Sequence, residues 1–196
     1  MAQSTTPPAM DLALVSVFAA LIAAFSLTPA IPVGPLGVPL TLQTLAITVT
    51  GLVLGAWRGF LATLLYVVVG LAGLPVLAGG KAGLGVMAGP TAGYLISFPI
   101  AAAATGALAA YFLRRGFKAQ YLWLVVAGLV PALLIVTPLG IAGFVVNAHM
   151  DLLHAIGVAL AYVPGDIAKV FAAAGIAVAV HKAFPALLAA PVPATA

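Results

Sequence analysis

Residues 11–28, with the sequence DLALVSVFAALIAAFSLT, form an apolar run of the length that a helix needs to cross a lipid bilayer. Pro29 follows directly and is expected to end this helix. A cleaved signal peptide would begin with positive charges, but the residues before this run contain no Lys or Arg, and five more apolar runs follow it. The run therefore predicts the first span of an integral membrane protein.

The rest of the chain has the same character. Hydrophobic residues make up 65% of the 196 residues and charged residues 5%, with a mean hydropathy of +1.30, which leaves too little polar surface for a water-soluble globule. Continuous apolar runs, rather than alternating ones, favour helices over a β-barrel. We predict an all-α, polytopic integral membrane protein, a single membrane domain over residues 1–196 with a disordered tail over 185–196. Its six transmembrane helices are expected at about residues 11–28, 40–55, 57–74, 91–113, 121–146 and 164–181.

The basic residues indicate the orientation of these helices. They fall between the second and third runs, between the fourth and fifth runs, and after the sixth run, so the positive-inside rule places these connections and both termini on the cytoplasmic side. Topology thus accounts for the sequence pI near 9.7, and we infer no nucleic-acid partner from it. The residues are Arg58, Arg114, Arg115, Lys118 and Lys182.

The residues that enzymes need are scarce. The chain has no cysteine, three aspartates and no glutamate, and neither G-x-x-x-x-G-K-[ST] nor G-x-S-x-G occurs. We therefore predict no enzyme, no catalytic residues, no metal site and no cofactor, and no binding of ATP by this chain. His149 and His154 are five positions apart beside Asp151, a spacing that does not place two imidazoles on one helical face, so we expect a solvated loop there.

Residues 164–169, PGDIAK, place two opposite charges in the first two turns of the sixth predicted helix. Pro164 fits the first turn, and Asp166 is favoured there by the helix dipole, so that one interpretation is a capping residue neutralised by Lys169. However, an ionisable group inside a span costs on the order of 2.5–3.5 kcal/mol on insertion scales, and such residues usually mark a functional site. We favour a ligand-binding site that opens to the outer side.

Other polar residues are expected at the same side. Gln43 and Thr41 lie at the outer end of the second predicted helix, followed by Thr44. Thr91 and Tyr94 begin the fourth helix, after a glycine-rich loop whose backbone can approach a ligand closely. Thr91 is either a ligand contact or a helix cap. Tyr94 is either a ligand contact or an aromatic ring at the membrane interface.

Two further positions carry weaker predictions. Asn147 ends the fifth predicted helix, where it is either a helix cap or a ligand contact. Lys81, in the glycine-rich loop, is either solvated or a cation on a lid.

Three segments in this order and spacing resemble a known family. They are VPLTLQTLAI (residues 38–47), GLAGLPVLAGGKAGLGVMAGPTAGYLISFP (70–99) and VPGDIAKV (163–170), and the resemblance extends over about residues 11–184. They resemble BioY, the biotin-specific substrate-binding subunits of energy-coupling factor (ECF) transporters. In that family the D-x-x-K pair of the last helix belongs to the binding pocket, which here corresponds to Asp166 and Lys169.

The resemblance implies a six-helix protein of a bacterial-type cytoplasmic membrane that captures biotin from the outer side and delivers it to the cytoplasm. It also implies partners, namely a transmembrane coupling subunit and two cytoplasmic ATPase subunits that alone bind ATP. Biotin is then a transported ligand. In this hypothesis Asp166 accepts a ureido N–H of biotin, while Gln43, Thr41 and Tyr94 complete the polar contacts. Lys169 pairs with an oxygen of the ligand, either the ureido carbonyl or the valerate carboxylate.

Small residues on the first helix suggest a contact surface. Ala19 and Ala23 are four positions apart, as are Ala20 and Ala24, and such spacing lets another helix approach closely. Composition alone is equally compatible with packing inside the protein. The resemblance favours docking of the coupling subunit at Ala19 and Ala23.

The alternative function is a stand-alone small-molecule transporter, facilitative or proton-coupled, with Asp166 as the proton site. The sequence is also compatible with a homo-oligomer.

Overall fold

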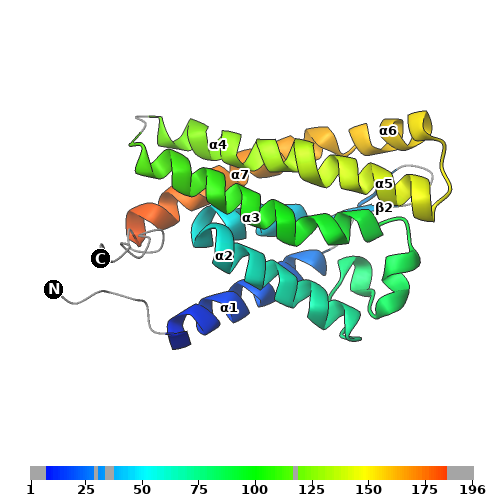
Figure 1. The fold of residues 1–196 in the computed structure, drawn as a ribbon, viewed down its shortest axis with the longest axis horizontal. Helices are drawn as coiled ribbons and strands as arrows, with labels where there is room; N and C mark the ends of the chain where they lie inside the picture. Colours follow the sequence, from blue (N-terminus) through cyan, green and yellow to red (C-terminus); the bar gives the residue numbers. More distant parts are fainter. Residues whose placement is uncertain (1–7, 29–30, 34–37, 117–118, 185–196) are drawn as a thin grey trace, which may run out of the picture.

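The structure is a computed structural model that describes residues 8–28, 31–33, 38–116 and 119–184. Its helices run lengthwise as a bundle (Figure 1). A two-stranded antiparallel hairpin follows the first helix, and two 3-10 segments and one π-helical segment complete the described elements. In chain order they are α1 Pro8–Ser26, β1 Ile31–Val33, β2 Val38–Leu40, α2 Gln43–Leu71, η1 Ala78–Gly80, η2 Leu84–Ala88, α3 Ala92–Arg114, α4 Gln120–Pro131, η3 Ala132–Val136, α5 Thr137–Asn147, α6 Leu152–Leu160 and α7 Val163–Ala183.

The bundle has two distinct ends. At the left of Figure 1, α1 begins, α3 ends, α4 begins and α7 ends, and we call this the basic end. The hairpin, η1, η2 and α6 lie at the opposite end, which we call the loop end. An ion pair between Asp11 and Arg58, with 2.7 Å between Oδ1 and the guanidinium nitrogen, joins α1 to α2 near the basic end. Lys118 and the predicted tail 185–196 lie outside the described residues.

Five helical stretches of the described residues are long and apolar enough to cross a membrane: Ala9–Ser26, Gln43–Leu71, Ala92–Arg114, Gln120–Asn147 and Val163–Ala183. The predicted class, a helical membrane protein, is thereby confirmed, with the short hairpin as an addition to an all-α architecture. The predicted helices at 40–55 and 57–74 correspond to the two parts of α2, before and after its interruption at Gly55, although α2 begins at Gln43 and ends at Leu71.

That interruption, at Gly55, reverses the chain. Gly55 has φ 80° and ψ −175°, a conformation that side-chain-bearing residues rarely adopt. In a straight helix Gln43 and Tyr66 would be about 34 Å apart at 1.5 Å per residue. Instead their side chains are hydrogen-bonded, with 2.8 Å between Nε2 and the phenol oxygen. The parts of α2 before and after Gly55 therefore lie side by side as an antiparallel pair.

Glycines allow α3 to pack tightly against this pair. A Cβ atom on Gly51 would lie 2.6 Å from the carbonyl oxygen of Ala102, and a Cβ on Gly106 would collide with the backbone of Gly55. The backbones of α2 and α3 thus approach as closely as small residues permit, which is how helices in membranes gain packing energy. The turn at Gly55 is held by α3 as well as by its own conformation.

The connection from α5 to α7 differs from the expected loop. Residues Leu152–Leu160 form the short helix α6, and the Asp151 carboxylate caps it by accepting a hydrogen bond from the backbone N–H of Leu153 at 3.0 Å. His149 and His154 are exposed, as expected for solvated residues. The buried side of this helix belongs to a cluster with Phe144 of α5 and Tyr94 of α3, a contact that the spacing of the two histidines could not reveal.

The close approach at Gly106 leads to a stability prediction. Gly106→Ala should lower the midpoint of thermal unfolding in detergent by several degrees, because overpacking of this kind costs about 1–3 kcal/mol. Gly175→Ala on α7 is the matched control, since the nearest atom to its added Cβ is 4.0 Å away. Equal midpoints for the two variants would contradict the proposed role of this contact.

Candidate functional site

A cavity opens among the elements of the loop end. It is bounded by the start of α2, the segment around η1 and η2, and the first turns of α3 and α7. The empty space of the cavity is about 680 Å³ with the open mouth included. Six sequence-predicted residues line it together: Thr41, Gln43, Thr91, Tyr94, Asp166 and Lys169.

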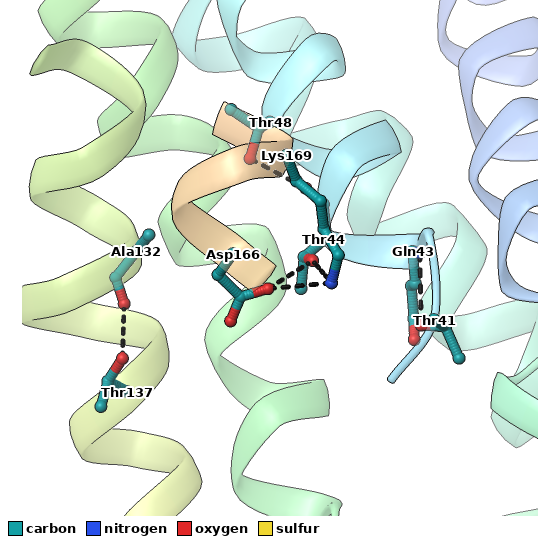
Figure 2. A network of polar contacts seen from close by, with 8 residues as sticks. All are labelled: Thr41, Gln43, Thr44, Thr48, Ala132, Thr137, Asp166 and Lys169. Carbon is teal, nitrogen blue, oxygen red and sulfur yellow. Dashed lines mark hydrogen bonds and ion pairs between the residues drawn. The ribbon is translucent and has the colours of Figure 1, made fainter. Parts of the chain in front are cut away.

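The charged pair of α7 meets a hydroxyl of α2 in this cavity. Lys169 Nζ donates hydrogen bonds to Asp166 Oδ1 and to Thr44 Oγ1, and Thr44 Oγ1 donates to the same Asp166 oxygen, each at 3.0 Å. Figure 2 shows the three side chains converging, with the second carboxylate oxygen pointing away from Thr44 and Lys169. The side chains of Lys169 and Asp166 are only 11% and 23% exposed. We call Thr44, Asp166 and Lys169 the charged cluster.

The helices explain why the charges are tolerated. Asp166 lies in the first turn of α7, and its carboxylate is bonded to Thr44 in the first turn of α2, so it lies beside the starts of two helices. The partial positive charge of a helix N-terminus stabilises an anion, and Lys169 neutralises it further. Since the side-chain hydrogen bonds of Asp166 connect α7 to α2, the carboxylate is more than a cap on its own helix.

Gln43 and Thr41 form the adjoining part of the wall. Both are buried, with 5% and 7% exposure. The Gln43 backbone N–H donates to Thr41 Oγ1 at 3.2 Å, and its side-chain amide donates to the Tyr66 hydroxyl. Thr41 therefore holds the entry into α2, and the Gln43 amide is anchored on one side while it lines the cavity.

Thr91 and Tyr94 lie at the opposite wall. Thr91 directly precedes α3, but its side chain makes no capping hydrogen bond. The structure therefore does not support the predicted alternative of a side-chain cap. Tyr94 is half-buried rather than facing lipid, because its ring packs against Gly140 and meets Phe144 edge-on at 5.6 Å between centroids. Both residues line the cavity.

Asn147 lies apart from the cavity lining. Its side-chain N–H groups donate to the carbonyl oxygens of Met87 at 2.9 Å and Gly89 at 3.0 Å. It thereby ties the end of α5 to the segment around η2. The structure gives Asn147 the role of holding the loop, and we leave it out of the ligand contacts proposed below.

Other residues that line the cavity were not among the predicted ligand contacts. Thr44 stands next to Gln43 in the same segment, but nothing in the sequence pairs it with α7. Tyr162 is buried at the end of α6, and burial raises the pKa of its phenol, which stays protonated and able to donate at physiological pH. Lys81 is exposed and lines the cavity, which fits both predicted alternatives, a solvated side chain and a lid cation. Apolar walls come from Leu77, Val86, Leu95 and Phe98.

The small residues of α1 divide between two faces. Ala19 is 7% exposed and belongs to the buried cluster around Tyr66, and Ala23 packs against that cluster. Ala20 and Ala24 are exposed. Adjacent residues of a helix point about 100° apart around its axis. Ala20 and Ala24 therefore lie on the exposed face of α1, whereas Ala19, one position before Ala20, lies on the inner face, which packs into the bundle.

Comparisons with known proteins agree with this architecture. The family model described as BioY family matches residues 1–186. The biotin transporter BioY of Rhizobium etli is 35% identical over 179 residues, covering 90% of this chain and 96% of the relative. That of Rhodobacter capsulatus is 40% identical over 169 residues, covering 82% and 87%.

A solved structure shares the fold. It is described as the S-component for biotin from an ECF-type ABC transporter, and it matches with a TM-score of 0.85 over 92% of this chain and 95% of that one, at 24% identity. The family model spans nearly the whole chain, and both relatives exceed 30% identity over most of their length. This chain belongs to the BioY family.

Proposed function

We propose that this protein is the biotin-binding subunit of an ATP-driven ECF-type importer, which captures biotin from the outer side and delivers it to the cytoplasm. The observation that carries this proposal is the charged cluster, which lines a cavity in a member of the BioY family. The relatives named above are described as biotin transporters. In this function the cavity binds its ligand without altering it.

The chemistry of biotin suits the groups in the cavity. Biotin has two ureido N–H groups, a ureido carbonyl, an apolar thioether ring and a valerate carboxylate. Asp166 can accept a ureido N–H, and Lys169 can donate to the ureido carbonyl, since a carboxylate accepts and an ammonium donates. Leu77, Leu95 and Phe98 would surround the thioether ring. Tyr94, Thr91 and Thr41 would supply further hydrogen bonds.

Charge balance favours one orientation of the ligand. Asp166 and Lys169 already neutralise each other at 3.0 Å, so the charged cluster has no net charge to offer to the valerate. Among the residues lining the cavity, Lys81 is the remaining charged side chain within the described part of the chain. We therefore place the ureido ring at the charged cluster and the carboxylate near Lys81.

The same proposal includes the topology. The protein is a multi-pass membrane protein, and we propose that the two arms of α2 cross the membrane separately, giving six crossings in a single membrane domain. The reversal at Gly55 supports this, as does the gathering of Arg58, Arg114 and Arg115 toward one end. By the positive-inside rule that end and both termini would face the cytoplasm.

Partners follow from the same proposal. A transmembrane coupling subunit would dock on the exposed small residues Ala20 and Ala24 of α1, where helix backbones can approach closely. Two cytoplasmic ATPase subunits would bind the ATP.

The charged cluster can be tested by biotin binding to the purified protein. Asp166→Asn and Lys169→Ala should each weaken affinity about 10- to 100-fold, the size expected when a hydrogen bond to a charged group is lost. Asp151→Asn and Lys182→Ala, at exposed positions away from the cavity, should bind like the wild type. Unchanged affinity in both cluster variants would remove them from the site.

The orientation of the ligand can be tested with biotinamide, which lacks the carboxylate charge. Lys81→Met should weaken biotin about two- to fivefold, as for an exposed ion pair, and leave biotinamide binding unchanged. Lys81→Arg should bind both ligands normally. If Lys169→Met instead weakens biotin while sparing biotinamide, the valerate meets Lys169 and our orientation is reversed.

The docking surface can be tested by copurification with the coupling subunit. Ala20→Trp and Ala24→Trp should abolish copurification and preserve biotin binding, because an indole prevents close helix approach at an exposed position. Ala107→Trp, exposed on α3, is the control and should still copurify. Copurification of all three variants would place the docking surface elsewhere.

A further inference from the structure

The hydroxyl of Thr44 connects the charged cluster to α2. Thr44 lies in the first turn of α2, whereas Asp166 and Lys169 lie in α7. Thr44 Oγ1, Asp166 Oδ1 and Lys169 Nζ form a triangle in which each pair of atoms is 3.0 Å apart. The three groups can be followed in Figure 2. Thr44 is therefore the point at which α2 holds the two charges of α7.

The chemistry of these three groups fixes the direction of each hydrogen bond. A carboxylate only accepts and an ammonium only donates, whereas a threonine hydroxyl has one hydrogen to donate and lone pairs that accept. The hydroxyl hydrogen of Thr44 therefore goes to Asp166, and its oxygen accepts from Lys169. No other arrangement of the hydrogens makes all three bonds.

The count of these hydrogen bonds shows which groups remain for a ligand. Asp166 Oδ1 accepts from both Thr44 and Lys169, so both of its lone pairs are used. Oδ2 accepts no hydrogen bond from the part of the chain that the structure describes, and it points away from both donors in Figure 2. Lys169 has three hydrogens, of which at most two serve the bonds of the cluster. The cluster therefore retains a free acceptor and at least one free donor.

We propose that Thr44 is a positioning residue that engages Oδ1 of Asp166, so that Oδ2 receives a ligand N–H. The inference rests on the proposed binding of biotin, whose ureido group has an N–H beside a C=O and so matches a free carboxylate oxygen and a free ammonium hydrogen. The terminal torsion of an aspartate side chain is broad, so a single hydrogen bond leaves the carboxylate free to turn. Two donors from two different helices hold it in one orientation.

Thr48 provides a matched control one turn further along α2. Like Thr44 it is a half-buried threonine, and both line a second, smaller pocket together with Asp166 and Lys169. Its hydroxyl hydrogen goes instead to the backbone carbonyl of Thr44 at 2.8 Å, a bond within the helix. Valine has the shape of threonine without the hydroxyl. The same substitution at the two positions therefore separates the charged cluster from general effects on α2.

The test is the biotin affinity of the purified variants. Thr44→Val should weaken binding about two- to tenfold, the size of one hydrogen bond, because the carboxylate loses its fixed orientation. Thr44→Ser keeps the hydroxyl and should bind nearly as the wild type does, and Thr48→Val should bind like the wild type. When Asp166 and Lys169 are both replaced by alanine, Thr44→Val should cause no further loss.

Several results would overturn the inference. Unchanged affinity in Thr44→Val would show that the hydroxyl has no effect on binding. Equal losses in Thr44→Val and Thr44→Ser, or in Thr44→Val and Thr48→Val, would show that the effect does not come from the hydroxyl of the cluster. An equal loss from Thr44→Val in the wild type and in the alanine background would assign the effect to the fold.

A second measurement does not depend on biotin. The chain has three aspartates and no glutamate, so few side chains contribute to its infrared carboxylate bands. The difference between the spectra of wild type and Asp166→Asn identifies the band of Asp166. In the unliganded protein Thr44→Val should shift this band, because Oδ1 loses one of its two donors, and Thr48→Val should leave it in place. An unshifted band in Thr44→Val would overturn the inference. Absence of biotin binding by the wild type would instead overturn the proposed function, and the role of Thr44 would then be judged by this band.

Discussion

The site depends on the reversal of the chain at Gly55. Because α2 folds back there, its first turn, with Gln43 and Thr44, lies beside its last part, with Tyr66. A continuous helix would separate these residues by most of the thickness of a membrane. The reversal requires a glycine conformation at Gly55 and a neighbouring helix without a side chain at Gly106. The wall of the cavity that the start of α2 forms thus depends on the backbone conformation at Gly55, which is distant from the cavity.

A second constraint acts on the charges. In surroundings of low dielectric constant a carboxylate and an ammonium group are stable together and costly apart. The Lys169 ammonium donates to the Asp166 carboxylate, and the Thr44 hydroxyl is hydrogen-bonded to both groups. The result is a polar but electrically neutral surface, which can bind a neutral ring with donors and acceptors. A ligand that also carries a negative charge must find its counter-charge elsewhere, and Lys81 lies along the same cavity.

The glycine-rich segment forms a wall because other elements satisfy its backbone. Asn147 donates to the carbonyls of Met87 and Gly89, Ser26 donates to that of Val76, and the Gly83 N–H donates to Gly70 at 2.8 Å. Irregular backbone within a membrane protein needs such partners, since lipid offers none. Loop and helices are therefore joined by hydrogen bonds at several points.

Much of this could be predicted from the sequence. Hydrophobic runs indicate helices because only helices and closed barrels satisfy the backbone in lipid, and the charged pair of α7 was identified because lone charges are too costly there. Six predicted residues do line one cavity. The prediction named Ala19 for docking, whereas the structure packs Ala19 into the cluster around Tyr66, and the prediction did not foresee α6, which packs near Tyr94 of α3; both depend on contacts with residues distant in sequence.

The sequence by itself determined that the chain is a helical membrane protein and where its charges enter the helices, because hydropathy and charge are local properties. Only the tertiary structure decided that Thr44 meets Asp166, that Tyr66 meets Gln43, and that Asn147 holds a loop. These pairs are separated by 122, 23 and 60 positions, and no local pattern links them. They come together because the chain reverses at Gly55 and the backbones of α2 and α3 pack closely at their glycines.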